Sequence, residues 1–182
     1  MAGKRIATAL LLALVTSCTP SAPHPAGGEA PAAGNTRVAG DGGIPKNGFI
    51  SLDDDAHAAI ANLDPVLLSA MRKAAADATL QGVEFRVTSG WRSAQYQQRL
   101  LDEAIELYSS EEEARRWVHP PEKSAHVTGK AMDIGPTNAD DWLIQHGAEY
   151  GLCQAYANEM WHFELLTTPG GECPQPRGTP GP

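Results

Sequence analysis

Two short segments constrain the fold of this chain more than any other feature of its sequence, because each carries side chains that bind zinc. Residues 124–133 read S-A-H-V-T-G-K-A-M-D, and residues 159–164 read E-M-W-H-F-E. A hydrolytic zinc site typically has three protein ligands, which are imidazole nitrogens or carboxylate oxygens, and keeps a fourth position open for water. His126, Asp133 and His162 are the candidate ligands. The fold must therefore bring the two segments together.

Both segments alternate like β-strands, and this would place the ligands side by side. In a strand from Gly129 to Ile134, the period of two puts Asp133 on a face of small residues. In the second segment, the same period sends an apolar face with Trp161, Phe163 and Leu165 into the core and turns His162 outward. Taken singly, each segment is more typical of a turn or a buried strand, so the prediction depends on the pair.

The pattern S-x-H-x-x-G-x-A-x-D followed by E-x-W-H-x-E resembles the zinc D,D-peptidases of the VanY-like D-alanyl-D-alanine carboxypeptidase family, which are LAS-type metallopeptidases. The resemblance covers about residues 64–166. It implies an enzyme that uses Zn²⁺ and water to remove the terminal D-Ala from peptidoglycan stem peptides. The alternatives are a peptidoglycan endopeptidase or D,D-dipeptidase of the same family, or a non-catalytic peptidoglycan-binding lipoprotein.

The resemblance also implies roles for residues around the metal. Glu159 matches the family's catalytic glutamate, which acts as a general base toward water and then as an acid toward the leaving amine. Arg92 lies in S-G-W-R-S, which resembles the family's G-Y-R-S motif, and would bind the substrate or stabilise the tetrahedral intermediate. Gln97 and Ser124 match family positions that line the substrate pocket.

Several of these assignments have open alternatives. Glu159 could instead be a solvated loop carboxylate or a fourth zinc ligand, and Ser124 could be a turn residue. Glu164 shares a strand face with His162, so it could accept a hydrogen bond from that imidazole and fix its tautomer, or form a surface salt bridge. The other histidines fit no ligand spacing and are predicted to be surface residues: His24, His57, His119 and His146.

The first part of the chain is predicted to export and tether a domain. Residues 1–17 have the layout of a secretory signal, with two basic residues before an apolar run that is too short to span a bilayer. Cys18 follows V-T-S, a pattern that resembles the lipobox of bacterial lipoproteins, so we expect it to be lipidated. The alternative is an ordinary cleaved signal. Residues 18–47 are rich in Pro, Ala and Gly and are predicted to be a disordered tether.

One domain is predicted to follow at residues 48–173, with a flexible tail at 174–182. Cys153 and Cys173 remain after the signal region, and in an oxidising compartment they are expected to form a disulfide. A metal site at this pair is the alternative, but it lacks nearby Cys or His partners. We therefore expect the chain at the outer face of the cytoplasmic membrane or in the cell wall, or otherwise secreted, with membrane contact only through the lipid anchor.

The net charge of the chain indicates which kinds of partner it can bind. The formal net charge is −8, and it falls to about −10 when the signal and its Lys4 and Arg5 are removed. A chain this acidic repels polyanions, so nucleic acid is disfavoured as a partner. We expect a monomer that acts on peptidoglycan stem peptides.

The remaining pattern predicts an α+β domain with a small, mostly antiparallel sheet flanked by helices. Helices are recognised by capping residues followed by apolar positions at helical spacing. The expected elements are a helix from Asp64 to Gly82, a strand at 83–88, helices from Ser93 to Tyr108 and from Ser110 to Val118, a strand at 129–134, a helix from Asn138 to Gly151, and a strand at 161–166.

Overall fold

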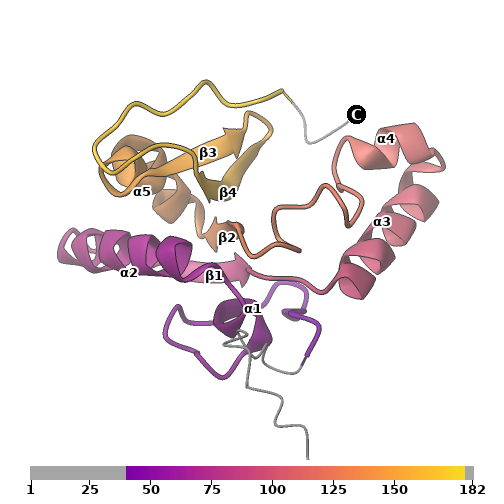
Figure 1. Ribbon diagram of the computed structural model, residues 1–182, viewed down its shortest axis with the longest axis horizontal. Helices are drawn as coiled ribbons and strands as arrows, with labels where there is room; N and C mark the ends of the chain where they lie inside the picture. Colours follow the sequence, from indigo (N-terminus) through magenta and orange to yellow (C-terminus); the bar gives the residue numbers. More distant parts are fainter. Residues whose placement is uncertain (1–39, 179–182) are drawn as a thin grey trace, which may run out of the picture. The chain divides into compact units, whose positions relative to one another are not determined.

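The computed structural model describes residues 40–178, which belong to one compact unit of the chain. The predicted signal peptide at 1–17, the lipidation site Cys18 and most of the tether lie outside the described residues. Figure 1 shows the elements, which are α1 (Ala58–Ala61), α2 (Pro65–Leu80), β1 (Arg86–Ser89), α3 (Ala94–Tyr108), α4 (Glu111–Arg115), β2 (Ala131–Gly135), α5 (Thr137–His146), the 3-10 helix η1 (Gly147–Tyr150), β3 (Leu152–Tyr156) and β4 (Glu159–Leu165). Within residues 40–178, no helix is both long and apolar enough to cross a bilayer.

The four strands form one sheet in the order β1-β2-β4-β3, and every neighbouring pair is antiparallel. This confirms the predicted α+β fold with a small antiparallel sheet. Strand β2 lies inside the sheet, and all five of its residues are buried. Strand β4 pairs with β2 so that Asp133 lies opposite His162. The two strands that carry candidate ligands therefore lie side by side, as predicted.

Side chains cap three helices where the sequence predicts caps. Asp64 accepts hydrogen bonds from the backbone N–H groups of Val66 and Leu67 at the start of α2. Ser93 caps α3 and Ser110 caps α4 in the same way. Each cap satisfies N–H groups that have no partner inside the helix, which typically stabilises a helix by about 1 kcal/mol.

Other local predictions are wrong. Helix α5 begins at Thr137 rather than behind Asn138, because the carbonyl of Pro136 already accepts the N–H of Ala139. Gly129 is not in a strand but in a turn with φ +74°, where a Cβ would lie 2.7 Å from a backbone oxygen of the preceding α1–α2 loop. Helix α1 and strand β3 were not predicted.

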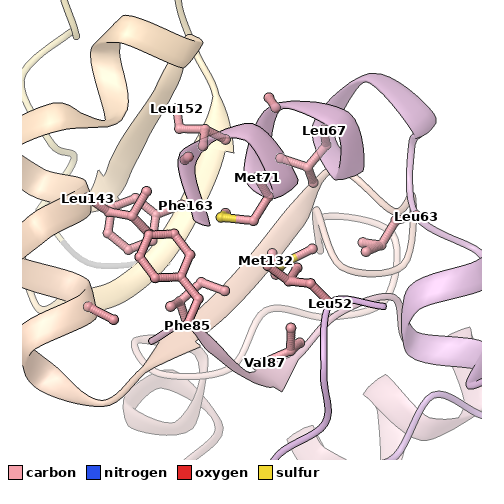
Figure 2. Packing of buried hydrophobic residues seen from close by; sticks show 14 of the residues in the cluster. Leu52, Leu63, Leu67, Met71, Phe85, Val87, Met132, Leu143, Leu152 and Phe163 are labelled. Carbon is pink, nitrogen blue, oxygen red and sulfur yellow. The ribbon is translucent and has the colours of Figure 1, made fainter. Parts of the chain in front are cut away.

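The main core lies between the sheet and helices α2 and α5. Figure 2 shows Met71 of α2, Leu143 of α5, Met132 of β2 and Phe163 of β4 within this cluster, and each is at most 1% exposed. Burying a side chain of this size contributes about 1.5–3 kcal/mol. Phe163 fulfils its predicted place in the core. The same core fixes β2 and β4, so it also fixes the ligands that these strands carry.

A second, smaller apolar cluster joins α3 to α4. It contains Leu101, Ala104 and Ala114. Figure 1 shows this helix pair apart from α2 and α5, with the chain returning from α4 toward β2. The pocket described below is lined from both sides, by residues of this helical pair and its loop and by residues of the sheet.

The predicted tether ends earlier than residue 47. The carbonyl of Asp41 accepts the N–H of Ser93, and its carboxylate forms an ion pair with Arg99 at 2.5 Å. Gly42 packs so closely that a Cβ there would lie 1.9 Å from the carbonyl oxygen of Trp91. The composition of residues 40–47 is that of a linker, but these contacts hold the segment against the start of α3.

The predicted flexible tail contacts the sheet through Arg177. We call residues 168–178 the C-terminal strap. A disulfide joins Cys173 to Cys153 of β3, with a Cα–Cα distance of 5.7 Å. Beyond it, the N–H of Arg177 donates to Ala155 at 2.9 Å, and its carbonyl accepts from Ala157 at 2.7 Å. The physical reason is that β3 is an edge strand, whose outer backbone groups are free to pair.

Candidate metal centre

The register of β2 and β4 sets the first two candidate ligands. Asp133 and His162 are directly opposite each other, and Asp133 Oδ1 lies 3.0 Å from His162 Nδ1. Both residues are buried, at 7% and 5% exposure. His162 does not point to solvent but into the pocket.

His126 reaches the same point from the loop before β2. Its ring Nδ1–H donates to the carbonyl of Gly90 at 2.8 Å, which leaves Nε2 facing the other two ligands. A side chain at Gly90 would collide with Ala59, since a Cβ would lie 2.2 Å from its carbonyl oxygen. The ring of His126 is thus oriented by a backbone segment that only glycine permits.

The three candidate ligand atoms lie 3.0–3.3 Å from one another, slightly closer than the ligands of a bound zinc ion. His126 Nε2 lies 3.2 Å from His162 Nδ1 and 3.3 Å from Asp133 Oδ1. Ligands about 2.0–2.2 Å from a tetrahedral ion lie about 3.3–3.6 Å from one another. Two imidazole nitrogens and one carboxylate oxygen also match the donor set of a catalytic zinc site. The residues present therefore fit the metal.

Burial and charge act on these groups in opposite directions. Burial lowers the pKa of His126, which favours the neutral imidazole that binds a metal. Burial alone would raise the pKa of Asp133, but the charges and hydrogen bonds of the two histidines hold it well below its usual range. Asp133 therefore carries the negative charge that a dication requires.

Arg92 holds the other oxygen of Asp133. Its Nη2 donates to Asp133 Oδ2 at 3.1 Å, its Nε to Ser89 Oγ at 2.8 Å, and its Nη1 to Gln97 Oε1 at 3.2 Å. A guanidinium has five N–H donors, so these three bonds leave at most two for a substrate. Arg92 thus orients a candidate metal ligand while its side chain also lines the pocket.

Gln97 and Ser124, the two weaker pocket assignments, both line the pocket. Gln97 is 1% exposed, and its Nε2 donates to the carbonyl of His119 at 2.8 Å while its oxygen accepts from Arg92. It therefore links Arg92 to the loop behind α4. Ser124 is 5% exposed, and its backbone carbonyl accepts the N–H of Val127, so it also forms part of a turn.

Glu159 begins β4 at the edge of the ligand cluster. It is 8% exposed, so it is not a solvated loop carboxylate. Its Oε2 lies 3.8 Å from His162 Nδ1. Burial raises the pKa of Glu159 to about 7, because this effect outweighs the charge of His162, which lowers it. A carboxyl group with a pKa near neutrality can both accept and return a proton.

Glu164 contacts the far side of the His162 ring. His162 Nε2 lies 3.2 Å from Glu164 Oε1, in the position for an N–H donated to the carboxylate. Burial alone would raise the pKa of Glu164, but His162 and Arg177 lower it. The same oxygen also pairs with Arg177 at 3.0 Å, so one carboxylate oxygen contacts both an imidazole nitrogen and a guanidinium.

The pocket around these groups has a volume of about 290 Å³, and part of its wall was not predicted. His119, expected at the surface, is half-buried, and its ring packs against Tyr156 at 5.8 Å. Trp161 is 41% exposed and lines the pocket instead of joining the core. Tyr156 was missed with β3, although the apolar run behind Gly151 is a strand signal. The remaining wall includes Leu100, Trp117 and Val118.

Comparison with known sequences identifies similar proteins. A family model described as VanY: D-alanyl-D-alanine carboxypeptidase matches residues 61–167. Among curated proteins, a D-alanyl-D-alanine carboxypeptidase of Enterococcus faecalis is 30% identical over 117 residues, which cover 49% of this chain and 42% of that protein. The match therefore spans less than half of that relative's length.

Solved structures share the fold. A mutant of the vancomycin resistance D,D-pentapeptidase VanY from the VanB-type resistance cassette, in complex with Zn(II), has a TM-score of 0.53 and 24% identity, covering 56% of this chain and 71% of that chain. The LdcB LD-carboxypeptidase has a TM-score of 0.52 and 24% identity, covering 58% and 59%. The D,D-dipeptidase VanXYg has a TM-score of 0.54 and 20% identity, covering 66% and 56%.

Proposed function

This chain belongs to the VanY family of D-alanyl-D-alanine carboxypeptidases, and we propose that it is a zinc-dependent enzyme that removes the terminal D-alanine from peptidoglycan stem peptides. The observation that carries the proposal is the convergence of His126, Asp133 and His162 beside the buried Glu159, in one pocket. Solved structures of similar fold that contain Zn(II) and D-alanine-D-alanine support the choice of metal and substrate.

The zinc ion would be held by His126 Nε2, His162 Nδ1 and one oxygen of Asp133. When bound, it supplies a Lewis acid that polarises the scissile carbonyl and lowers the pKa of water. Other residues of the chain orient these ligands on the side away from the metal. The carbonyl of Gly90 accepts the Nδ1–H of His126, and Glu164 accepts the Nε2–H of His162. Such partners hold each ring in the tautomer that binds a metal.

Glu159 is the group that moves protons in this proposal. Its carboxylate accepts a proton from the attacking water and returns it to the amine of the leaving D-alanine. Its carboxylate also lies within 4 Å of His162, close to where the ligands converge. The pocket side of Arg92 offers its remaining N–H donors to a substrate carboxylate or to a developing oxyanion.

The carboxypeptidase assignment is tested with two peptides that end in D-Ala-D-Ala and differ only at the terminus. One has a free carboxylate and the other a terminal amide. We expect release of D-alanine from the free peptide and little or no cleavage of the amide, because Arg92 then has no carboxylate to bind. Equal cleavage of both would overturn the carboxypeptidase assignment in favour of an endopeptidase, and cleavage of neither by zinc-loaded protein would indicate a binding protein without catalysis.

The cellular part of the proposal is export and anchoring through a lipid on Cys18. It is supported by the layout of the first 18 residues and by the disulfide between Cys153 and Cys173, which is typical of an oxidising compartment. We expect a fatty-acid label to be incorporated into the wild-type chain and not into the Cys18→Ala variant. Unlabelled wild-type protein in the culture medium would indicate an ordinary cleaved signal instead.

A further inference from the structure

The C-terminal strap brings one charged side chain to the back of the candidate metal centre. Its backbone pairs with the edge of β3 through Arg177, and the disulfide at Cys173 fixes the strap four residues earlier. The strap lies outside residues 61–167, the part of the chain that matches the family model. The match therefore assigns no role to the strap.

Arg177 makes two side-chain contacts of different kinds. Its Nη2 lies 3.0 Å from Glu164 Oε1, and its guanidinium stacks over the ring of Tyr156 at 4.4 Å. The Arg177 side chain is 54% exposed, whereas that of Glu164 is 13% exposed. The arginine thus covers a nearly buried carboxylate from the solvent side, and the aromatic ring holds its planar group in place.

Both of these neighbours touch His162. Glu164 Oε1 accepts from the outer ring nitrogen of His162, and it is the same oxygen that pairs with Arg177. The ring of Tyr156 lies 5.3 Å from the ring of His162. A continuous set of contacts therefore runs from the strap through Glu164 to Nδ1 of His162, the atom that faces Asp133 and His126.

We propose that Arg177 is a positioning residue for the metal centre, which acts through Glu164 by holding its carboxylate against His162. The inference rests on the zinc site of the proposed function. With Arg177 present, one oxygen of Glu164 is fixed between a cation and an imidazole N–H. Without it, the carboxylate can rotate toward water, and His162 loses the partner that holds its tautomer.

The test is the zinc dissociation constant, measured by competition with a chromophoric chelator at constant pH. We expect Arg177→Ala to weaken zinc binding about 3- to 5-fold. Removing a direct partner of a metal ligand costs about 10- to 100-fold, and Arg177 acts one contact further away through a partly exposed ion pair. Arg177→Lys keeps the charge and should recover part of this loss.

Arg86 provides a matched control. It also pairs with a glutamate at 3.0 Å and lies over an aromatic ring at 4.5 Å, but its partners Glu84 and Phe49 are not in the pocket. Arg86→Ala should bind zinc as tightly as the wild type. If Arg177→Ala also binds zinc as tightly as the wild type, the strap has no positioning role and the inference is wrong.

A second measurement tests the route through Glu164. In a Glu164→Gln background, Arg177→Ala should cause no further loss of zinc affinity, because the two changes remove one interaction. Fully additive losses would overturn the proposed route. Wild-type protein that binds no zinc would overturn the metal site as well. Of these outcomes, only that one would also contradict the proposed function.

Discussion

The strand pair β2–β4 and the C-terminal strap both contact His162, but they are built in opposite ways. The strand pair carries Asp133 and His162, which are themselves buried, and the position of each side chain follows from backbone register. The strap is exposed along residues 174–178 and is held by a disulfide and by pairing at the edge of β3. One region is fixed by the core, and the other is attached to its outside.

This difference predicts which substitutions have large effects and which have small ones. A change in the strand pair removes a group that no neighbour can replace, because the buried surroundings cannot rearrange to supply another ligand. A change in the strap leaves the ligands in place and alters only how firmly one of them is held. The comparison predicts loss of the site in the first case and graded effects in the second.

The largest effect is expected for His126→Ala, which removes the ligand that the loop before β2 adds to the two ligands of the strand pair. Removing one of three ligands should weaken zinc binding by more than the roughly 100-fold that the loss of an outer partner can cause, and activity should disappear with the metal. Metal content measured by mass spectrometry after dialysis checks this. His146→Ala serves as the control, since that histidine lies on α5 and pairs with Glu149 outside the pocket. Stoichiometric zinc in a variant that lacks His126, Asp133 and His162 would contradict the assignment of the site.

Glu159→Ala separates catalysis from the scaffold within the same buried region. Glu159 is not one of the three converging ligands, so the variant should keep its zinc and its fold. It should lose about 10²- to 10⁴-fold in rate, the usual contribution of a positioned general base. Steady-state kinetics and zinc content, measured on one preparation, check both halves. A variant that loses zinc together with activity would make Glu159 a ligand rather than a base.

The contrast between the two regions also explains which parts of the fold and of the site could be predicted from the sequence. The meeting of Asp133 and His162 could be predicted because alternation along β2 and β4 restricts which side chains face each other. Asp64, Ser93 and Ser110 mark helix starts by their capping chemistry. Strand β3 was missed because its hairpin turn, Ala157-Asn158, lacks the glycine that usually marks a tight turn.

The pairing of residues 174–177 with the sheet was not predicted, for a related reason. The strap's proline and glycine content indicates flexibility, and nothing local in the sequence shows that an edge strand lies within reach of Arg177. Likewise, the partner of Arg92 is Asp133, a residue far along the chain, and only the fold brings them together. Local sequence patterns cannot predict contacts between segments that are distant in the chain.

Removal of the disulfide is the next prediction in size, and it concerns the strap. The bond closes a loop of 20 residues, which contributes about 3 kcal/mol to the free energy of unfolding on the chain-entropy model. We expect the urea midpoint of the oxidised wild type to exceed that of the reduced protein accordingly. The Cys153→Ala/Cys173→Ala variant should not respond to reductant. Two free thiols in oxidised wild-type protein, detected by intact mass, would contradict the bond itself.

The smallest effect among these is expected for Arg92→Lys. This variant tests whether Arg92 serves mainly to orient the ligand Asp133 or mainly to bind the substrate. Lysine keeps the positive charge near Asp133 but loses the planar fork that reaches Ser89 and Gln97 as well. Asp133 remains in its strand, because β2 is fixed by the core on both sides of it. Zinc affinity should therefore change little.

Recognition of the substrate should change more, because a single ammonium group cannot hold Asp133 and a terminal carboxylate in the same geometry. We expect a fall of about tenfold in kcat/KM for the peptide with a free D-Ala terminus, equivalent to about 1.4 kcal/mol, with a smaller fall for its amide. Arg99→Lys, on α3 and paired with Asp41, is the control and should leave both values unchanged. If Arg92→Lys instead loses zinc while the free and amidated peptides are affected equally, then Arg92 serves the ligand Asp133 alone, and another donor must bind the substrate carboxylate.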